Sequence, residues 1–231
     1  MAWKAPLLDM QFVLQHWLQA DKAWQAMPPH ADLDLDLAWQ VLEQAARFTE
    51  QVLVPLNATG DRQGCRMEAG QVRTPHGFPA AYQAYVEAGW PALACTPQFG
   101  GQGLPLVLDA ALQEMLFASN HAWAMYTGIA HGAYQCLQAH ASEQLQARYL
   151  PGIVSGEILP TMCLTEPQAG SDLGLLRCRA EPLGDGRYAI TGNKLFISGG
   201  DHDLTRQIVH LVLAGGAGGG ARAPAGGGGR G

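Results

Sequence analysis

The sequence predicts an α+β protein in which a helical domain precedes a β-domain. Up to about residue 158, apolar residues recur at steps of three and four, which is typical of amphipathic helices. Between about 159 and 213 the period changes to two, and turn residues separate short apolar runs, as in strands. From 214 to 231 only Gly, Ala, Arg and Pro occur, a composition that cannot bury apolar area. We therefore expect domains at 1–158 and 159–213 and a disordered tail at 214–231.

Two apolar stripes and one capping residue define the predicted helices. The first stripe consists of Leu37, Val41, Ala45, Phe48 and Val52. Pro55 is expected to end that helix because proline lacks the amide proton. The second stripe consists of Leu108, Ala111, Leu112, Met115 and Leu116. A further helix is expected in 121–140, and Ser142 is expected to cap a helix over 143–150 that Pro151-Gly152 ends. The glycines of the loop 99–105 indicate unusual backbone angles or a close approach.

The β-domain is predicted as a meander. Strands over 177–182 and 187–191 are joined by the turn signal Leu183-Gly-Asp-Gly186. A third strand is expected over 194–198, and a fourth over 207–213. A truncated or frame-shifted reading of a longer protein is the simplest hypothesis for the abrupt change at Ala214.

Composition narrows the class of protein. The formal net charge of −6, without a basic block, argues against a nucleic-acid partner and leaves anionic small molecules open. The five cysteines form no C-x-x-C pair, so a reducing, cytoplasmic location is expected rather than a disulfide framework. We find no signal-peptide core and no apolar run of about 18 residues, so no membrane span is expected.

The segment 162–174, MCLTEPQAGSDLG, is the first candidate site. Gly170-Ser171 permits a tight turn that exposes consecutive amide groups, an arrangement suited to phosphate oxygens. Thr165 and Ser171 add hydroxyl groups, and Asp172 is expected to stabilise the turn by bonding to the backbone. The alternative is a polar turn that holds no ligand.

The segment 194–200, KLFISGG, is the second candidate. As a strand it would present Phe196 and Ser198 on one face, a ring and a hydroxyl that suit a flat heteroaromatic ligand. The alternative places Phe196 in the core and leaves Ser198 exposed.

The other polar residues indicate no site. Asp201-His202-Asp203 is expected to be a solvated turn rather than a metal centre, because three adjacent ligands rarely converge on one ion. His121 and His131 lie too far apart along a helix to share a small ligand, so we interpret them as surface or packing residues. The match of 226–231 to the dinucleotide fingerprint is rejected because no strand precedes it.

The two motifs, in this order and with the loop Gly100-Gly-Gln-Gly-Leu-Pro105 upstream, resemble the acyl-CoA dehydrogenase family. The resemblance covers roughly residues 1–213. The stretches MAWKAPLLDM and ISGGDHDLT are similar to the branch of 3-methylmercaptopropionyl-CoA dehydrogenase-like enzymes. The resemblance implies a helical domain, a middle β-domain and a C-terminal four-helix bundle, and it implies FAD as the cofactor. We expect the bundle to be absent from this chain and the β-domain to be truncated.

The resemblance also implies roles for single residues. The Leu164 backbone and the Thr165 hydroxyl would bond the flavin ring edge, and Ser198 would reach flavin N5. Gly170 and Ser171 would approach the FAD pyrophosphate, and Ser171 also the substrate's phosphopantetheine side. The remaining implied flavin contacts are Phe196, in place of a frequent Trp, and Met162, where an aromatic residue is common.

The implied reaction is α,β-dehydrogenation of an acyl-CoA, with hydride transfer to flavin N5 and an electron-transfer flavoprotein as the acceptor. Intact family members form homo-oligomers. The family's catalytic Glu comes from the C-terminal bundle, so no catalytic residue is assigned here, and Glu166 is interpreted as a turn residue. We expect little activity from this chain alone. The alternatives are a non-catalytic fragment and an acyl-CoA oxidase-like flavoprotein of the same fold.

Overall fold

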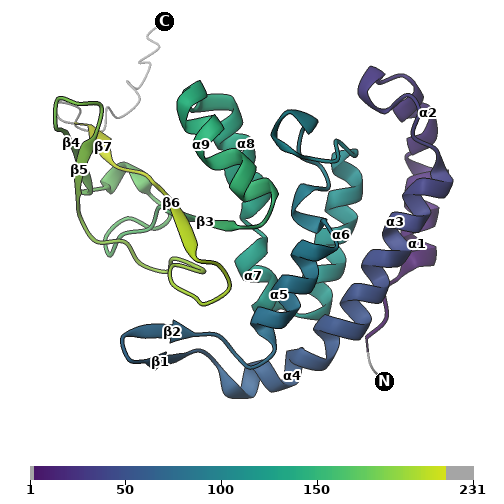
Figure 1. Ribbon diagram of the computed structural model, residues 1–231, viewed down its shortest axis with the longest axis horizontal. Helices are drawn as coiled ribbons and strands as arrows, with labels where there is room; N and C mark the ends of the chain where they lie inside the picture. The colour runs from purple at the N-terminus through teal and green to yellow at the C-terminus, as the bar shows by residue number, and fades with distance from the viewer. Residues whose placement is uncertain (1–2, 217–231) are drawn as a thin grey trace, which may run out of the picture. The chain divides into compact units, whose positions relative to one another are not determined.

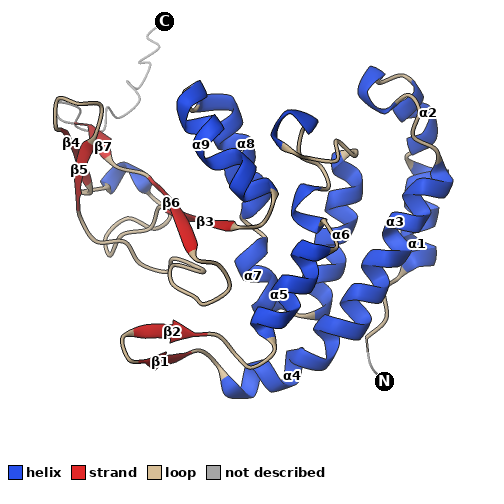
Figure 2. Cartoon of the chain, viewed as in Figure 1, coloured by secondary structure: helices blue, strands red, loops and turns tan. Residues whose placement is uncertain are grey.

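The computed structural model describes residues 3–216, which divide into two compact units. The helical unit comprises residues up to 160 together with 201–209, and the β-rich unit comprises 161–200 and the residues from 210 onward. Figures 1 and 2 show a helix-rich N-terminal part and strands mainly in the C-terminal part of the chain. This order of elements confirms the predicted α+β class.

Nine α-helices form most of the helical unit within the described residues. They are α1 (Leu7–Gln11), α2 (Ala20–Gln25), α3 (Leu35–Phe48), α4 (Val54–Gln63), α5 (Phe78–Glu87), α6 (Leu106–Ser119), α7 (His121–Thr127), α8 (Ala130–His140) and α9 (Glu143–Val154). Short π- and 3₁₀-segments connect or extend them: η1 (Phe12–Trp17), η2 (Pro28–His30), η3 (Thr49–Leu53), η4 (Trp90–Ala92) and η5 (Pro97–Phe99). In Figure 1, α3 and α6 run alongside each other, and their residues are in contact.

The core of the helical unit lies where α3, α5, α6 and α7 meet. Its largest fully buried side chains include Trp123, Phe78, Leu42, Leu108 and Met115. The stripe predicted on α6 is confirmed, because all but the half-buried Ala111 are buried. The stripe predicted on α3 is confirmed except at its first residue, because Ala45 and Phe48 are buried and Val41 and Val52 pack against the core. Leu37 is 46% exposed, and Ala38 and Leu42 are buried in its place.

Two predicted helix ends are wrong. Pro55 does not stop the chain from being helical, because the π-segment η3 precedes it and Pro55 lies in the first turn of α4, where its missing amide is tolerated. Likewise, α9 continues past Pro151 to Val154, because only its last turn is affected. The Ser142 cap is confirmed, since its hydroxyl accepts from the Leu145 amide at 3.4 Å.

The glycine-rich loop before α6 confirms the prediction of a close approach. Gly100 and Gly103 have φ of +90° and +67°. A Cβ added to Gly101 would lie 2.0 Å from the carbonyl oxygen of Cys95. Backbone hydrogen bonds hold the loop in place, including Gly101 N to Thr96 O at 3.0 Å and Gly103 N to Cys95 O at 2.8 Å.

The strands do not form the predicted meander. The hairpin β1 (Arg66–Glu68) and β2 (Gln71–Arg73), which was not predicted, interrupts the helical block. Strand β3 (Ile158–Cys163) pairs with β6 (Gln207–Val212). A separate sheet has the order β5 (Tyr188–Thr191), β4 (Arg179–Pro182) and β7 (Gly215–Gly216), with β4 and β5 antiparallel and β4 and β7 parallel. The predicted hairpin at 183–186 is therefore confirmed.

Two further expectations for this region differ from the structure. Residues 194–198 form a loop rather than a third strand, because Phe196 has a φ of +58°, which breaks an extended run. The tail was expected to be disordered from Ala214, but Gly215–Gly216 forms β7, held by the Gly215 amide bonded to Cys178 O at 2.9 Å. The remainder of that predicted tail, 217–231, lies outside the described residues.

Candidate functional site

The first motif begins as a strand and continues as a tight turn in the β-rich unit. Thr161 and Cys163 on β3 are buried, whereas Met162 between them is 49% exposed, as the alternation of a strand requires. After β3, the amide of Glu166 donates to the carbonyl of Ala169 at 2.9 Å, and the reverse bond is 3.0 Å. These two bonds close a turn over 166–169, whereas the sequence predicts the tight turn at Gly170-Ser171, where the chain only bends.

The turn leads to an exposed segment that contains the residues predicted for phosphate binding. Gly170 and Ser171 are both exposed, and a Cβ at Gly170 would meet no neighbour within 4 Å. Asp172 Oδ1 accepts from the Gly174 amide at 2.9 Å and begins the 3₁₀-helix η6 (Leu173–Leu175). The expected backbone bond of Asp172 is therefore confirmed, and the two residues before it are open to solvent.

The second motif lies against the first. The Leu195 amide donates to the Thr165 carbonyl at 2.9 Å, and Lys194 Nζ donates to the Leu164 carbonyl, also at 2.9 Å. Leu164 and Thr165 are half-buried, as is Ser198. The structure thus brings the 162–172 and 194–200 segments together, as expected for one shared site.

Phe196 is the most unusual residue of this region. Its side chain is 89% exposed, and its backbone lies in the left-handed region with a φ of +58°. A non-glycine residue in this conformation costs about 1–2 kcal/mol, and an exposed ring gains nothing from burial. Neither the core position nor the two-faced strand considered from the sequence is correct for Phe196. Strained backbone positions cluster at functional sites, which makes Phe196 a candidate for a ligand contact.

Glu166 is the polar centre that holds the two motifs together, and sequence reasoning missed this role. It is 3% exposed, and Lys194 Nζ lies 3.0 Å from its Oε1. The carboxylate also accepts from the backbone amides of Arg177 at 2.7 Å and Cys178 at 3.0 Å, and from Gln168 Nε2 at 2.7 Å. The signal in the sequence was one acid in the first motif and one base at the start of the second.

These bonds lower the pKa of Glu166 to about 2. The largest cause is the hydrogen bond from the Arg177 backbone amide; burial opposes it, and bonds from Lys194, Cys178 and Gln168 assist it. A carboxylate with so low a pKa is a poor general base. The pKa therefore agrees with leaving Glu166 out of a catalytic role.

The low pKa predicts acid sensitivity of the β-rich unit. The pKa of Glu166 is about 2 in the folded protein and has an ordinary value of 4.5. The ionised carboxylate therefore stabilises the fold fully above pH 4.5, and this stabilisation is lost as the pH falls from 4.5 through 2. We expect Glu166→Gln to abolish this part of the pH dependence. Urea midpoints measured for both proteins between about pH 7 and about pH 2.5 test this. Parallel pH profiles for the two proteins would contradict it.

The Asp201–Asp203 segment is only in part the expected solvated turn: Asp201 is exposed at a bend, whereas Asp203 is bonded within the helical unit. Asp203 Oδ1 accepts from the Thr74 amide at 3.1 Å and from its hydroxyl at 2.7 Å. His202 is 7% exposed and its ring meets that of Tyr126 edge-on, with centroids 5.6 Å apart. No group of three or more metal-binding side chains occurs between residues 3 and 216. Within the segment only His202 is buried, whereas Asp203, bonded to Thr74 next to β2, is half-buried and Asp201 is exposed.

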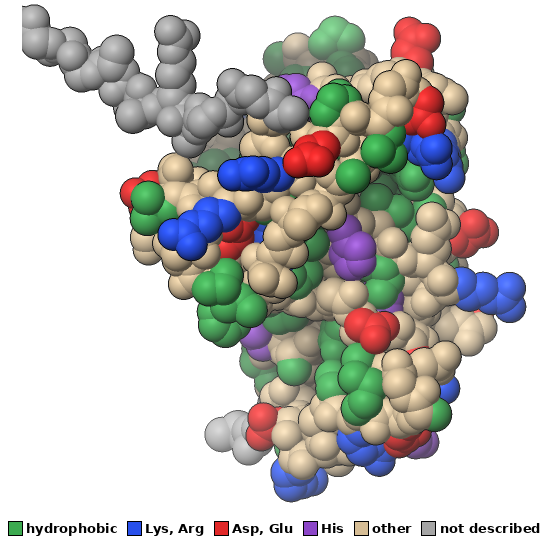
Figure 3. All heavy atoms as spheres, turned by 90° about the vertical axis from the view of Figure 1, so that its left-hand side faces the viewer, with side chains coloured by type: hydrophobic (Ala, Val, Ile, Leu, Met, Phe, Trp, Pro, Cys, Tyr) green, Lys and Arg blue, Asp and Glu red, His purple; other side chains and the backbone are tan. Residues whose placement is uncertain are grey.

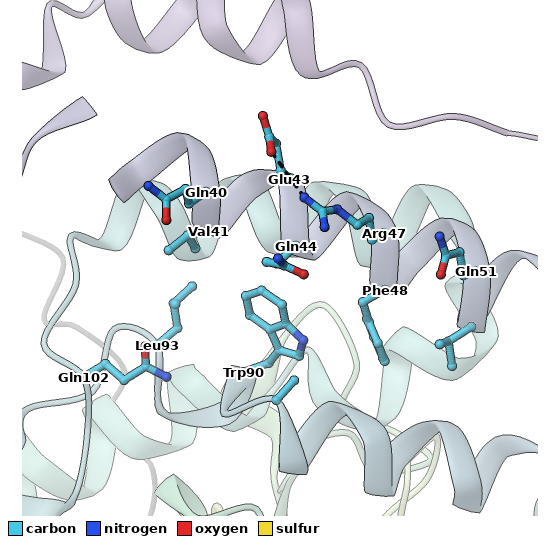
Figure 4. Close-up of a pocket in the computed structure, with 12 residues that line it drawn as sticks. Gln40, Val41, Glu43, Gln44, Arg47, Phe48, Gln51, Trp90, Leu93 and Gln102 are labelled. Atoms are coloured by element: carbon cyan, nitrogen blue, oxygen red, sulfur yellow. Dashed lines mark hydrogen bonds and ion pairs between the residues drawn. The ribbon is translucent and has the colours of Figure 1, made fainter. Parts of the chain in front are cut away.

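A hollow of about 640 Å³ lies elsewhere, in the helical unit between α3 and the Trp90–Leu93 segment. Figure 4 shows Gln44 and Phe48 of α3 on one side of it and Trp90 on the other, with the Glu43–Arg47 ion pair of 3.3 Å on α3. None of the predicted site residues lines this hollow. Its lining therefore does not contribute to the two-motif site.

Within residues 3–216, the face drawn in Figure 3 has no patch of charged side chains of a single sign. There, acidic and basic side chains of the described residues are interspersed among hydrophobic ones. Within the described part of the chain, the helices are too short or too polar to cross a membrane.

Comparisons with known proteins identify the family to which the chain is similar. Residues 38–157 match the family described as acyl-CoA dehydrogenase, N-terminal domain. The chain is 40% identical over 214 residues to 3-methylmercaptopropionyl-CoA dehydrogenase of Ruegeria pomeroyi, covering 93% of this chain and 36% of that protein. It is 35% identical to a butyryl-CoA dehydrogenase of Syntrophomonas wolfei, covering 89% and 34%. The chain thus spans about a third of the length of these relatives.

The fold is also found in solved structures. An acyl-CoA dehydrogenase from Bacillus anthracis, complexed with FAD, aligns with a TM-score of 0.65 at 20% identity. The alignment covers 80% of this chain and 30% of that one. This likeness supports the fold, namely a helical domain followed by part of a β-region.

Proposed function

This chain belongs to the acyl-CoA dehydrogenase family, and we propose that it contributes a flavin site to an FAD-dependent α,β-dehydrogenation of an acyl-CoA thioester. When bound, FAD supplies the acceptor for the hydride that leaves the β-carbon. This chain would bind and orient the isoalloxazine ring and the phosphates.

One observation carries the proposal: Phe196 presents an exposed ring from a strained backbone position, in a segment bonded to the Leu164–Thr165 segment. A flat heteroaromatic ring stacked on Phe196 would bury that side chain and offset its strain. The hydroxyls of Thr165 and Ser198 are half-buried polar groups in the same two segments. The residues present therefore fit a flavin ring.

The remaining candidate residues are assigned to the pyrophosphate, the flavin ring edge and the thioester substrate. The exposed Gly170-Ser171 segment would take the pyrophosphate, since its backbone can approach a ligand without a side chain at Gly170. The Leu164 backbone would meet the ring edge and Met162 would form part of the wall, while Ser171 would also face the pantetheine side of the thioester. We further propose an electron-transfer flavoprotein as the acceptor and a homo-oligomer as the assembly.

The base that removes the α-proton is assigned to no residue of this chain. Glu166 is held by four donors and has its pKa lowered to about 2, so it would not accept a proton at neutral pH. We accordingly propose that this chain alone binds FAD but dehydrogenates acyl-CoA slowly or not at all.

The proposal predicts FAD binding that depends on the two hydroxyl residues. Titration of the purified chain with FAD, followed by flavin fluorescence, should saturate. Thr165→Ala and Ser198→Ala should each weaken binding about tenfold, the cost of one lost hydrogen bond in a desolvated site. Thr59→Ala, which removes an exposed hydroxyl on α4, is the matched control and should bind normally.

Two outcomes would count against the proposal. Equal FAD affinity in the control and in both site variants would refute the assigned contacts. Turnover of an acyl-CoA with an artificial electron acceptor, at the rate of an intact relative, would refute the absence of a base from this chain.

A further inference from the structure

Three segments of the β-rich unit converge on a single carboxylate. Oε2 of Glu166 accepts from Arg177 N and Gln168 Nε2, each at 2.7 Å. Oε1 accepts from Cys178 N and Lys194 Nζ, each at 3.0 Å. The side chains of Glu166 and Lys194 are only 2% and 11% exposed. Both carboxylate oxygens are thus fully satisfied inside the protein.

Lys194 extends this network to the proposed ring contact. Besides Glu166, its ammonium group donates to the Leu164 carbonyl at 2.9 Å. One residue later, the Leu195 amide bonds the Thr165 carbonyl at 2.9 Å. The backbone of both ring-edge residues is therefore tied to the start of the segment that contains Phe196 and Ser198.

A buried ion pair of this kind contributes little net stability, because removing two charges from water offsets their attraction. The better-supported role of a buried ion pair is to fix the relative positions of the groups around it. Neither 164–165 nor 194–200 lies in a regular strand, so this ion pair fixes the separation of two loops.

We propose that Glu166 and Lys194 are positioning residues that hold the Leu164–Thr165 segment and the Phe196–Ser198 segment at the separation a flavin ring requires. This inference rests on the proposed function for the identity of the ligand. The pair touches neither ring nor substrate in this proposal. It acts through the backbone of Leu164 and through the chain that leads to Phe196.

The first experiment needs no ligand. Hydrogen exchange of the Leu195 amide, measured by NMR, reports the bond between the two segments. Glu166→Gln and Lys194→Met should each speed this exchange by about tenfold or more, the effect of losing one charged hydrogen bond. The control is Asp185→Asn, which removes an exposed ion pair of 2.6 Å with Arg187 in the β4–β5 turn. That variant should leave the Leu195 amide unchanged.

The second experiment adds FAD to the same proteins. Both pair variants should bind FAD about tenfold more weakly and shift the visible absorption bands of the bound flavin, whereas Asp185→Asn should do neither. Lys194→Arg keeps the charge and should restore part of the affinity. A global loss of folding would be seen as faster exchange also at the Leu183 amide, which donates to the Arg187 carbonyl at 2.9 Å in the β4–β5 hairpin.

The outcomes separate the two proposals. Unchanged Leu195 exchange in both pair variants overturns the positioning role, as does wild-type FAD affinity and spectrum in both of them. If the wild-type chain binds no FAD, the flavin proposal fails and the positioning of a flavin site fails with it. If the wild type and Thr165→Ala differ in FAD affinity but the pair variants match the wild type, only the positioning proposal fails.

Discussion

Trp123→Ala is expected to lower the free energy of unfolding of the helical unit by about 3–5 kcal/mol. Trp123 is fully buried on α7. Its ring meets Tyr85 edge-on at a centroid distance of 5.4 Å and Phe48 at 6.2 Å. Its indole nitrogen donates to the Phe78 carbonyl at 3.3 Å, so truncation would also remove a buried hydrogen bond. One side chain therefore contacts both α3 and α5.

Urea unfolding followed by far-UV circular dichroism measures this loss without depending on tryptophan fluorescence. Trp17→Ala is the matched control, because Trp17 is 76% exposed and its removal should change stability by less than about 0.5 kcal/mol. Similar midpoints for the two variants would show that the α3–α5–α7 contact does not organise this unit.

The fold was predictable wherever one face of an element meets the core. The α6 stripe and the Ser142 cap depend on local spacing and on one side chain, and both were found as expected. On α3 only Leu37 was misplaced, because Ala38 and Leu42 face the core in its place. Residue size at a helix contact depends on how closely the partner helix approaches, which periodicity does not contain.

The strand order was not predictable for a different reason. The pairing of β3 with β6 and of β4 with β7 joins segments far apart in the sequence, and no local signal specifies such a pairing. Only the β4–β5 hairpin was predicted, because its turn residues lie between its strands.

The candidate site was predicted as a set of residues but not as a geometry. The resemblance placed both motifs, and Leu195 N and Thr165 O confirm that they adjoin. What holds them, the Glu166–Lys194 pair, was interpreted only as a turn acid and a strand start. A buried charge pair is specified by the three-dimensional burial of both partners, which a sequence pattern does not give.

Gly101→Ala is expected to destabilise the helical unit by about 3 kcal/mol, because the added methyl group would overlap backbone rather than a movable side chain. The new Cβ would lie 2.0 Å from the Cys95 oxygen and 2.2 Å from its carbonyl carbon. Relief would require breaking the bonds of Gly101 N to Thr96 O and of Gly103 N to Cys95 O. The loop before α6 would then lose the hydrogen bonds that hold it in place.

Gly100→Ala and Gly132→Ala separate this overlap from the general effects of replacing glycine. Gly100 has open space around its Cβ position but a φ of +90°, so alanine there should cost about 1–2 kcal/mol from backbone strain alone. Gly132 lies within α8 with no neighbour within 4 Å, so alanine should stabilise by about 0.5–1 kcal/mol. Chemical denaturation of the three variants should therefore give the order Gly132→Ala, wild type, Gly100→Ala, Gly101→Ala from most to least stable. If Gly101→Ala were as stable as Gly100→Ala, the close approach to Cys95 would not constrain the loop.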